Sequence, residues 1–191
     1  MVRKLRTIEM NRLTVEQFRE AEKMPLIVVL DDVRSMYNVG SVFRTCDAFR
    51  VEAIYLCGIT AIPPHTEIHK TALGAEDAVA WQHFDSAVEA VESLHANGYR
   101  VFSIEQVEGS TKLEELNILL KSDPQPPNLG GSEKYAIVLG NEVKGVHQEV
   151  VDASDGCIEI PQYGTKHSLN VSVTAGIVIH EFHRVISTAC V

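Results

Sequence analysis

The chain has 191 residues, of which 45% are hydrophobic and 23% charged, the balance of an ordinary globular domain. No apolar run reaches the roughly 18 residues that a membrane span requires, and the basic start lacks the apolar stretch of a secretory signal. The four cysteines show no CxxC spacing, which favours reduced thiols over a disulfide framework or a metal site. We therefore expect a cytoplasmic protein that does not enter a membrane.

The formal net charge of −9 weighs against a nucleic-acid partner, because phosphate binding depends on Lys and Arg side chains. Positive charges nevertheless gather in the first 24 residues, at Arg3, Lys4, Arg6, Arg12, Arg19 and Lys23. A local basic patch allows an acidic protein to bind RNA. The charge lowers the expectation of RNA binding without excluding it.

The N-terminal segment predicts a short helical arm over residues 1–24. Thr14 and Gln17 have the spacing of a capping box, and the helix should end before Met24-Pro25 because the residue before a proline disfavours helix. Residues 25–191 then form the main domain.

Apolar segments in this domain alternate with helical patterns. Strands are expected over residues 26–30, 53–57, 100–104, 135–139 and 157–160. Helices are expected over 39–49, 85–97 and from Ser168 to about Ser187, whereas 65–81 are weakly patterned and 121–132 form a loop. This order predicts an α/β fold, a mostly parallel sheet with helices on both faces.

Ligands of such sheets bind at the carboxyl ends of the strands, which directs attention to the loops after Leu30, Ile104, Leu139 and Ile160. In the first loop, Asn38 would cap a helix and Arg44 follows six residues later. These side chains could bind a phosphate or orient a hydroxyl. Alternatively, Asn38 is only a cap and Arg44 only pairs with Asp31 or Asp47.

The loop after Leu139 contains Gly140, Glu142 and Gly145, which permit close backbone approach beside a fixed negative charge. It is not a P-loop, and no GxGxxG follows any strand. In the last segment Ser168 would cap the final helix. Asn170 would form a hydrogen bond with the nearby backbone, or a bound ligand would supply the hydrogen-bond partners that buried polar groups at the helix start need.

Metal binding has weak support. His65 and His69 have an i, i+4 spacing but no evident third ligand, and two adjacent carboxylates, Asp31 and Asp32, are more often solvated or paired. We expect no metal.

Together these segments resemble the SpoU (TrmH-like) class of SPOUT RNA 2′-O-methyltransferases. Asn38 with Arg44 matches the first motif, and the apolar strand leading to Gly140 and Glu142 matches the second. Pro161 and the run from Ser168 to Val173 match the third. The resemblance extends from about Leu26 to Ile186, in the family's order.

The resemblance implies a SPOUT-type fold with a C-terminal trefoil knot, S-adenosyl-L-methionine as cofactor and a homodimer. Cofactor-binding residues would be Leu139, Gly140, Ile160, Ser168 and Leu169, and catalytic residues Arg44, Asn38, Ser168, Asn170 and Glu142. The substrate would be a ribose 2′-hydroxyl, in tRNA rather than ribosomal RNA. A ribosomal RNA methyltransferase, or a non-catalytic RNA-binding protein of the same fold, remains the alternative. Arg44 would act as a cation rather than as a base, because guanidinium does not deprotonate in proteins.

Overall fold

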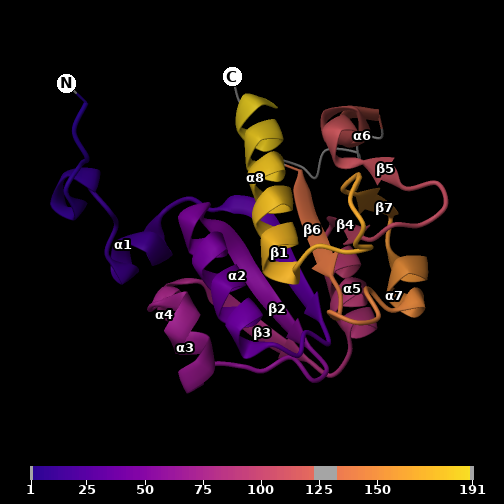
Figure 1. The fold of residues 1–191 in the computed structure, drawn as a ribbon, viewed down its shortest axis with the longest axis horizontal. Coiled ribbons are helices and arrows are strands. Elements are labelled where there is room, and N and C mark those ends of the chain that lie inside the picture. The colour runs from indigo at the N-terminus through magenta and orange to yellow at the C-terminus, as the bar shows by residue number, and fades with distance from the viewer. Residues whose placement is uncertain (1, 123–132, 190–191) are drawn as a thin grey trace.

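The computed structural model describes residues 2–122 and 133–189. Within them, strands form one parallel sheet in the order β3-β2-β1-β6-β4-β7-β5 (Figure 1). The strands are β1 Met24–Asp31, β2 Val51–Cys57, β3 Ala80–Phe84, β4 Tyr99–Ile104, β5 Thr111–Lys112, β6 Lys134–Leu139 and β7 Gly156–Glu159. The predicted parallel sheet is confirmed.

The helices are α1 Val15–Glu20, α2 Met36–Ala48, α3 Thr66–Ala72, α4 Ala75–Ala78, α5 Ala87–Ala96, α6 Leu116–Ser122, α7 Gln148–Ala153 and α8 Val171–Ala189. Two short 3₁₀ helices cover Thr7–Met10 and Leu113–Glu115. Among the helices of the described part, none combines the length and the apolar character that a bilayer crossing requires.

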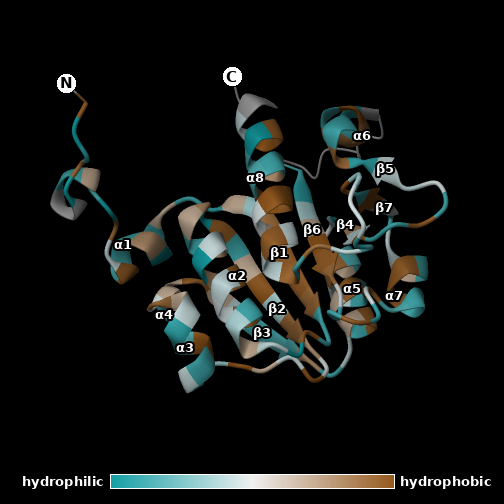
Figure 2. Cartoon of the chain, viewed as in Figure 1, coloured by the Kyte–Doolittle hydropathy of each residue, from teal (hydrophilic) through white to brown (hydrophobic). Residues whose placement is uncertain are grey.

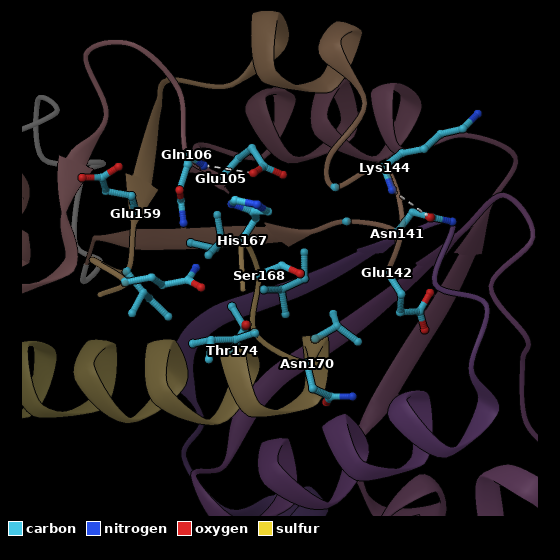
Figure 3. A pocket seen from close by; sticks show the side chains of 18 of the residues that line it. Glu105, Gln106, Asn141, Glu142, Lys144, Glu159, His167, Ser168, Asn170 and Thr174 are labelled. Atoms are coloured by element: carbon cyan, nitrogen blue, oxygen red, sulfur yellow. Dashed lines mark hydrogen bonds between the residues drawn. The ribbon is translucent and has the colours of Figure 1, made fainter. Parts of the chain in front are cut away.

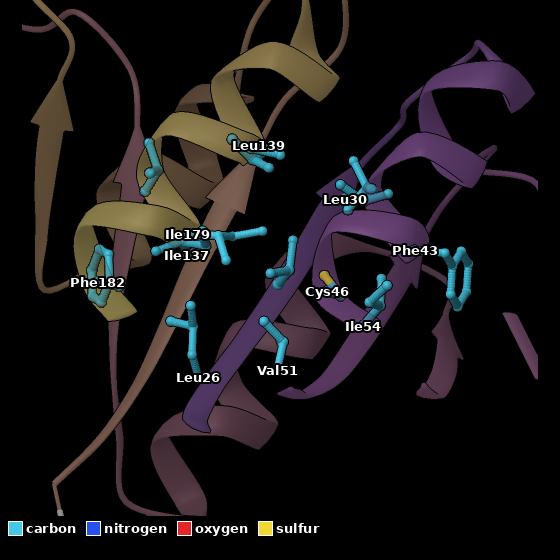
Figure 4. Packing of buried hydrophobic residues seen from close by; sticks show 14 of the residues in the cluster. Leu26, Leu30, Phe43, Cys46, Val51, Ile54, Ile137, Leu139, Ile179 and Phe182 are labelled. Atoms are coloured by element: carbon cyan, nitrogen blue, oxygen red, sulfur yellow. The ribbon is translucent and has the colours of Figure 1, made fainter. Parts of the chain in front are cut away.

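The two faces of the sheet carry separate hydrophobic clusters, because side chains alternate along a strand. On β1, Leu26 and Leu30 pack into the cluster under α2 and α8, whereas Ile27 packs into the cluster under α5 and α7. Figure 4 shows Phe43 and Cys46 of α2 and Ile179 and Phe182 of α8 in the first cluster. Figure 2 shows the central strand β1 as predominantly hydrophobic. The expectation of helices on both faces is confirmed.

Two strands and several short helices were not predicted. Strand β3 is an edge strand whose residues Ala80–His83 are exposed, so it lacks the buried apolar run of a central strand. Strand β5 has only two residues. The weakly patterned region 65–81 folds into α3, α4 and the start of β3. Such short elements offer too few residues for a periodicity to emerge.

The predicted starts of the main helices need correction. Helix α2 begins at Met36, because the Ser35 side chain accepts a hydrogen bond from the Asn38 backbone N–H; Asn38 is therefore not the cap. Helix α8 begins at Val171 with Asn170 as its capping residue, so Ser168 is not the cap either. Helix α5 begins at Ala87, capped by Ser86.

The predicted capping box of the arm is confirmed, since Thr14 and Gln17 bond each other's backbone N–H. Phe18 anchors α1 in the core, and the chain before α1 extends away from the sheet (Figure 1). Cys46, Cys57 and Cys157 are free thiols, as expected. In the predicted loop over 121–132, Lys121 and Ser122 belong to α6 and the rest lies outside the described residues, as does Cys190. The trefoil knot stays a prediction.

Candidate active site

A cavity of about 460 Å³ lies at the carboxyl edge of the sheet, where β4, β6 and β7 end (Figure 3). It is lined by Ile104, Glu105, Gln106, residues 139–145, Ile158, Glu159, Ile160, Gln162, residues 167–171 and Thr174. The loops after Ile104, Leu139 and Ile160 therefore meet here, as the carboxyl-edge rule predicts. The volume falls within the range of small-molecule sites.

The loop after β6 is a closed hairpin. The backbones of Asn141 and Gly145 exchange two hydrogen bonds, of 3.1 and 2.9 Å between N and O. A Cβ on Gly140 would lie 2.1 Å from the Gly145 carbonyl carbon, and Gly145 itself has φ +71°, so both positions require glycine. The Asn141 amide donates to the Asp32 carbonyl at 2.9 Å and ties this hairpin to the end of β1.

Glu142, at the tip of this hairpin, holds the start of α2. Its carboxylate accepts hydrogen bonds from the backbone N–H groups of Arg34 and Ser35 and from the Asn38 amide, each at 3.0 Å. A helix N-terminus leaves N–H groups unsatisfied and favours negative charge, so Glu142 meets both needs.

Asn38 and Asn170 extend this contact to the third motif segment. The Asn38 side-chain oxygen accepts from the Asn170 amide at 3.1 Å. The Asn170 oxygen in turn accepts from the backbone N–H of Ser172 at 2.9 Å and of Val173 at 3.3 Å, which caps α8. Glu142, Asn38 and Asn170 thus form one hydrogen-bonded triad, and it joins three segments that are far apart in the sequence.

The hydrogen bonds that Glu142 accepts set its charge state. Partial burial acts to raise the pKa of this carboxyl, but the hydrogen bonds from Arg34, Ser35 and Asn38 stabilise the anion and outweigh burial. The pKa of Glu142 consequently lies below its ordinary value of 4.5, and the group is ionised at neutral pH.

The predicted cofactor-binding residues come together at the cavity. Leu139, Gly140, Ile160, Ser168 and Leu169 all line it. Ser168 and Leu169 are exposed, and Ser168 makes no hydrogen bond with any residue that the structure describes. The Ser168 hydroxyl is therefore available to a ligand.

Two predicted site residues do not line the cavity: Asn38, which is hydrogen-bonded to the lining residues Glu142 and Asn170, and Arg44. Arg44 is exposed on α2, is absent from the cavity lining, and forms no ion pair or hydrogen bond within residues 2–122 and 133–189. The alternative pairing with Asp31 or Asp47 is thus not formed. Six residues along a helix correspond to a rise of about 9 Å and a turn of about 240°, which places Arg44 and Asn38 on different faces.

Three residues that support the hairpin, Glu105, Asp31 and His147, were not among the predicted cofactor-binding or catalytic residues. Glu105, which follows β4, accepts a hydrogen bond from the Val146 N–H at 3.0 Å and lines the cavity. Asp31, 3% exposed, accepts from the His147 N–H at 3.0 Å and from its ring Nδ1 at 2.9 Å. The carboxyl-edge rule pointed to these loops, but only long-range contacts identify the residues.

The carboxylates of Asp31 and Asp32 and the His147 ring also form a three-residue cluster whose potential ligand atoms lie within 4.8 Å of one another. Hydrogen bonds already engage both carboxylates, since Asp31 bonds His147 and Asp32 accepts from the Ile59 N–H. His65 caps α3 and His69 pairs with Glu76, and neither joins a three-ligand group in the described portion. These hydrogen bonds explain why Asp31, Asp32 and His147 lie close together.

The fold and the cavity define an α/β protein with a cavity of small-molecule size at the carboxyl edge of a parallel sheet. A sequence profile of the SpoU rRNA methylase family matches residues 25–180, so the chain belongs to this family. It is an RNA methyltransferase, and S-adenosylmethionine is the methyl donor of this class.

Relatives and solved structures agree with this assignment. The chain is 28% identical over 185 residues to a tRNA (guanosine(18)-2′-O)-methyltransferase of Aquifex aeolicus, covering 96% of this chain and 81% of that protein. The crystal structure of the A. aeolicus TrmH/SpoU tRNA modifying enzyme superposes with a TM-score of 0.76 at 26% identity, over 92% of this chain and 84% of the other.

An AdoMet-bound rRNA methyltransferase from Sinorhizobium meliloti gives a TM-score of 0.71 at 25% identity, over 87% of this chain and 59% of that one. An uncharacterized tRNA/rRNA methyltransferase of Borreliella burgdorferi is 28% identical over 170 residues, which cover 89% of this chain and 68% of the relative. These similarities support the SPOUT-type parallel sheet.

Proposed function

We propose that this protein transfers a methyl group to a ribose 2′-hydroxyl, in tRNA rather than in ribosomal RNA, and that it acts in the cytoplasm. The observation that carries the proposal is the Glu142–Asn38–Asn170 triad, because it assembles the three motif segments at the mouth of one cavity. The extensive match to a tRNA 2′-O-methyltransferase supports the choice of tRNA.

The cavity residues suit S-adenosylmethionine. Leu139, Gly140, Ile160 and Leu169 would hold it through backbone groups and apolar contacts, with the free Ser168 hydroxyl nearby. When bound, S-adenosylmethionine supplies a methyl carbon that carries its own leaving group. The protein then has to hold the ribose oxygen in line and stabilise the charge that develops on it.

We assign charge stabilisation to Arg44 and support of the site to Asn38, Glu142 and Asn170. The guanidinium stays protonated, so its contribution is electrostatic, on the developing alkoxide or on the adjacent phosphate. Because Arg44 does not line the cavity of its own chain, it would act on RNA at the mouth of the cavity or on RNA bound by a second copy. Asn38 and Asn170 are bound to each other and to Glu142, so their role is to fix the loops around the ribose.

We further propose a homodimer. Val173 and Ile177 on α8 are 50% and 39% exposed, although the opposite side of this helix is buried in the core. A cavity of about 610 Å³, lined in part by Phe49, Pro161 and Ile177, lies along the same helix. A second copy would cover this apolar stripe. Light scattering tests the proposal, and a monomer at micromolar concentration with intact methyl transfer would contradict it.

Transfer of radiolabelled methyl groups to purified tRNA and ribosomal RNA tests the function, together with a map of 2′-O-methyl positions in cells with and without the gene. We expect label in tRNA and the loss of one ribose methylation. Label only in ribosomal RNA would favour a ribosomal RNA methyltransferase. Binding of cofactor and RNA without any methyl transfer would favour a non-catalytic RNA-binding protein of the same fold. Calorimetry with a chelator present should show undiminished cofactor binding, since we expect the cofactor to be held by backbone groups of the loops and not by a metal.

A further inference from the structure

Three basic side chains near the mouth of the cavity have no partner in the part of the chain that the structure describes. Arg34, Lys144 and Lys166 are exposed, and their side chains make no hydrogen bond or ion pair there. Elsewhere among the described residues, three cations form ion pairs with carboxylates: Arg3 with Glu9, Lys70 with Glu67, and Arg184 with Glu181. Arg34, Lys144 and Lys166 differ from other unpaired cations by their position beside the cavity.

The structure brings the backbones of two of these residues, Arg34 and Lys144, into neighbouring loops. Glu142 accepts a hydrogen bond from the Arg34 backbone N–H at 3.0 Å, and Lys144 lies two residues beyond Glu142 in the closed hairpin. The Asn141 side chain accepts from the Lys144 backbone N–H at 3.2 Å. The two loops are therefore anchored through their backbones, whereas the charged ends of both side chains are exposed.

Three acidic side chains at this edge are held by backbone groups. Glu142, Glu105 and Asp31 all accept hydrogen bonds from backbone N–H groups. Their carboxylates are engaged within the loops, whereas Glu159, which also lines the cavity, makes no hydrogen bond among the described residues. This arrangement gives a chain of net charge −9 a local surface that suits an anion.

Lys144 belongs to the rim rather than to the interior of the cavity. In Figure 3 its side chain points away from His167 and Ser168, while Glu142 and Asn170 lie toward α2. The neighbouring Val143 is 77% exposed, so the tip of the hairpin presents an apolar side chain beside a cation. A sugar–phosphate strand has both a charged and a less polar surface and matches this pair.

We propose that Arg34 and Lys144, with Lys166 beside the lining residue His167, bind backbone phosphates of the RNA strand next to the ribose that enters the cavity. The inference rests on the proposed function, because it takes RNA as the substrate. These contacts position the strand and carry no sequence information.

The test is the salt dependence of equilibrium binding to total tRNA, measured for Arg34→Ala, Lys144→Ala and the double variant. Each phosphate contact contributes about 0.7–0.9 to the slope of log affinity against log salt, so each single variant should lower the slope by about that amount. We expect about three- to tenfold weaker RNA binding for each single variant and unchanged cofactor affinity. Lys144→Arg should retain the slope.

Lys134→Ala is the matched control, because Lys134 is exposed at the opposite end of the same strand, β6. It should bind tRNA as the wild type does. Wild-type slopes in both Arg34→Ala and Lys144→Ala would overturn the proposal. So would weaker cofactor binding by Lys144→Ala, which would make this lysine a ligand of the cofactor carboxylate.

Failure of the proposed function gives a different result. If the wild type binds tRNA but transfers no methyl group to it, the proposed function is wrong. The salt dependence of tRNA binding by Arg34→Ala and Lys144→Ala then still shows whether these side chains contact phosphates. If the wild type binds no tRNA at all, the phosphate contacts are overturned as well.

Discussion

The two ends of α2 carry the two residues of one motif, and their surroundings are opposite. At the start of the helix, the Asn38 side chain bonds both Glu142 and Asn170. Toward its end, Arg44 is exposed and has no partner among residues 2–122 and 133–189. A shared motif therefore combines a residue that assembles the site with a residue left free for RNA or for a second copy.

The direction of the helix explains this division. Helix α2 starts at the carboxyl edge of the sheet and runs back along its face, so successive turns move away from the cavity. Asn38 lies in the first turn, where the hairpin and α8 can reach it. Substitutions at the two ends of α2 should therefore separate an effect on chemistry from an effect on assembly of the site.

The largest effect is expected for Arg44→Ala, which should lower methyl transfer about a hundredfold to a thousandfold, the scale of losing a single charge-stabilising donor. Cofactor affinity and melting temperature should remain those of the wild type, because Arg44 contacts neither the cavity nor the core. Arg44→Lys should restore little, since a point charge does not replace the planar fork. Radiolabel incorporation and cofactor titration measure the two quantities, and wild-type turnover in Arg44→Ala would refute the assignment.

Glu142→Ala should affect assembly as well as activity. Hydrogen bonds to a charged group contribute about 1.5–3 kcal/mol, and the exposure of Glu142 reduces this to about 1–2 kcal/mol of unfolding free energy. The hairpin would also lose its hold on α2, so cofactor affinity should fall. Urea unfolding and calorimetry measure both effects. Glu142→Gln, which keeps one accepting oxygen, should lie between Glu142→Ala and the wild type; equal stability of all three would show that the triad does not hold α2.

Asn170→Ala and Ser168→Ala form a pair that separates capping from ligand contact. Asn170→Ala removes the cap of α8 and should cost about 1 kcal/mol of unfolding free energy. Ser168→Ala should leave stability unchanged and reduce cofactor binding or methyl transfer, because this hydroxyl faces the cavity without a partner among the described residues. Thermal unfolding of both variants provides the measurement, and the reverse order of stabilities would restore Ser168 as the cap.

The smallest effect concerns pH. Because folding lowers the pKa of Glu142 below 4.5, this carboxylate contributes stability that is fully present above the unfolded-state pKa and is lost as the pH falls through the folded-state pKa. The stability difference between wild type and Glu142→Gln should therefore be constant near neutral pH and shrink in the acid range. Urea unfolding of both proteins from pH 7 to pH 3 tests this, and a difference that grows toward low pH would contradict it.

Much of the fold could be predicted from the sequence because its signals are local. The apolar run 26–30 belongs to a strand buried on both faces, and the spacing of Thr14 and Gln17 specifies a cap within one turn. The motif residues Asn38, Glu142 and Asn170 could be selected as well, because they belong to the segments that resemble the SpoU motifs and their loops follow strands whose carboxyl ends meet.

Only the tertiary structure decided how these residues are used. Ser168 and Asn170 are both good capping residues, and the choice depends on where the loop after β7 joins α8. Glu142 and Asn38 are 104 residues apart, so no local pattern records that one holds the other. Strand β3 exists because β2 offers it a free edge, although its own residues are largely exposed. Hydrogen bonds between distant segments depend on the packing of the whole sheet, and this is why neighbouring residues in the sequence do not reveal them.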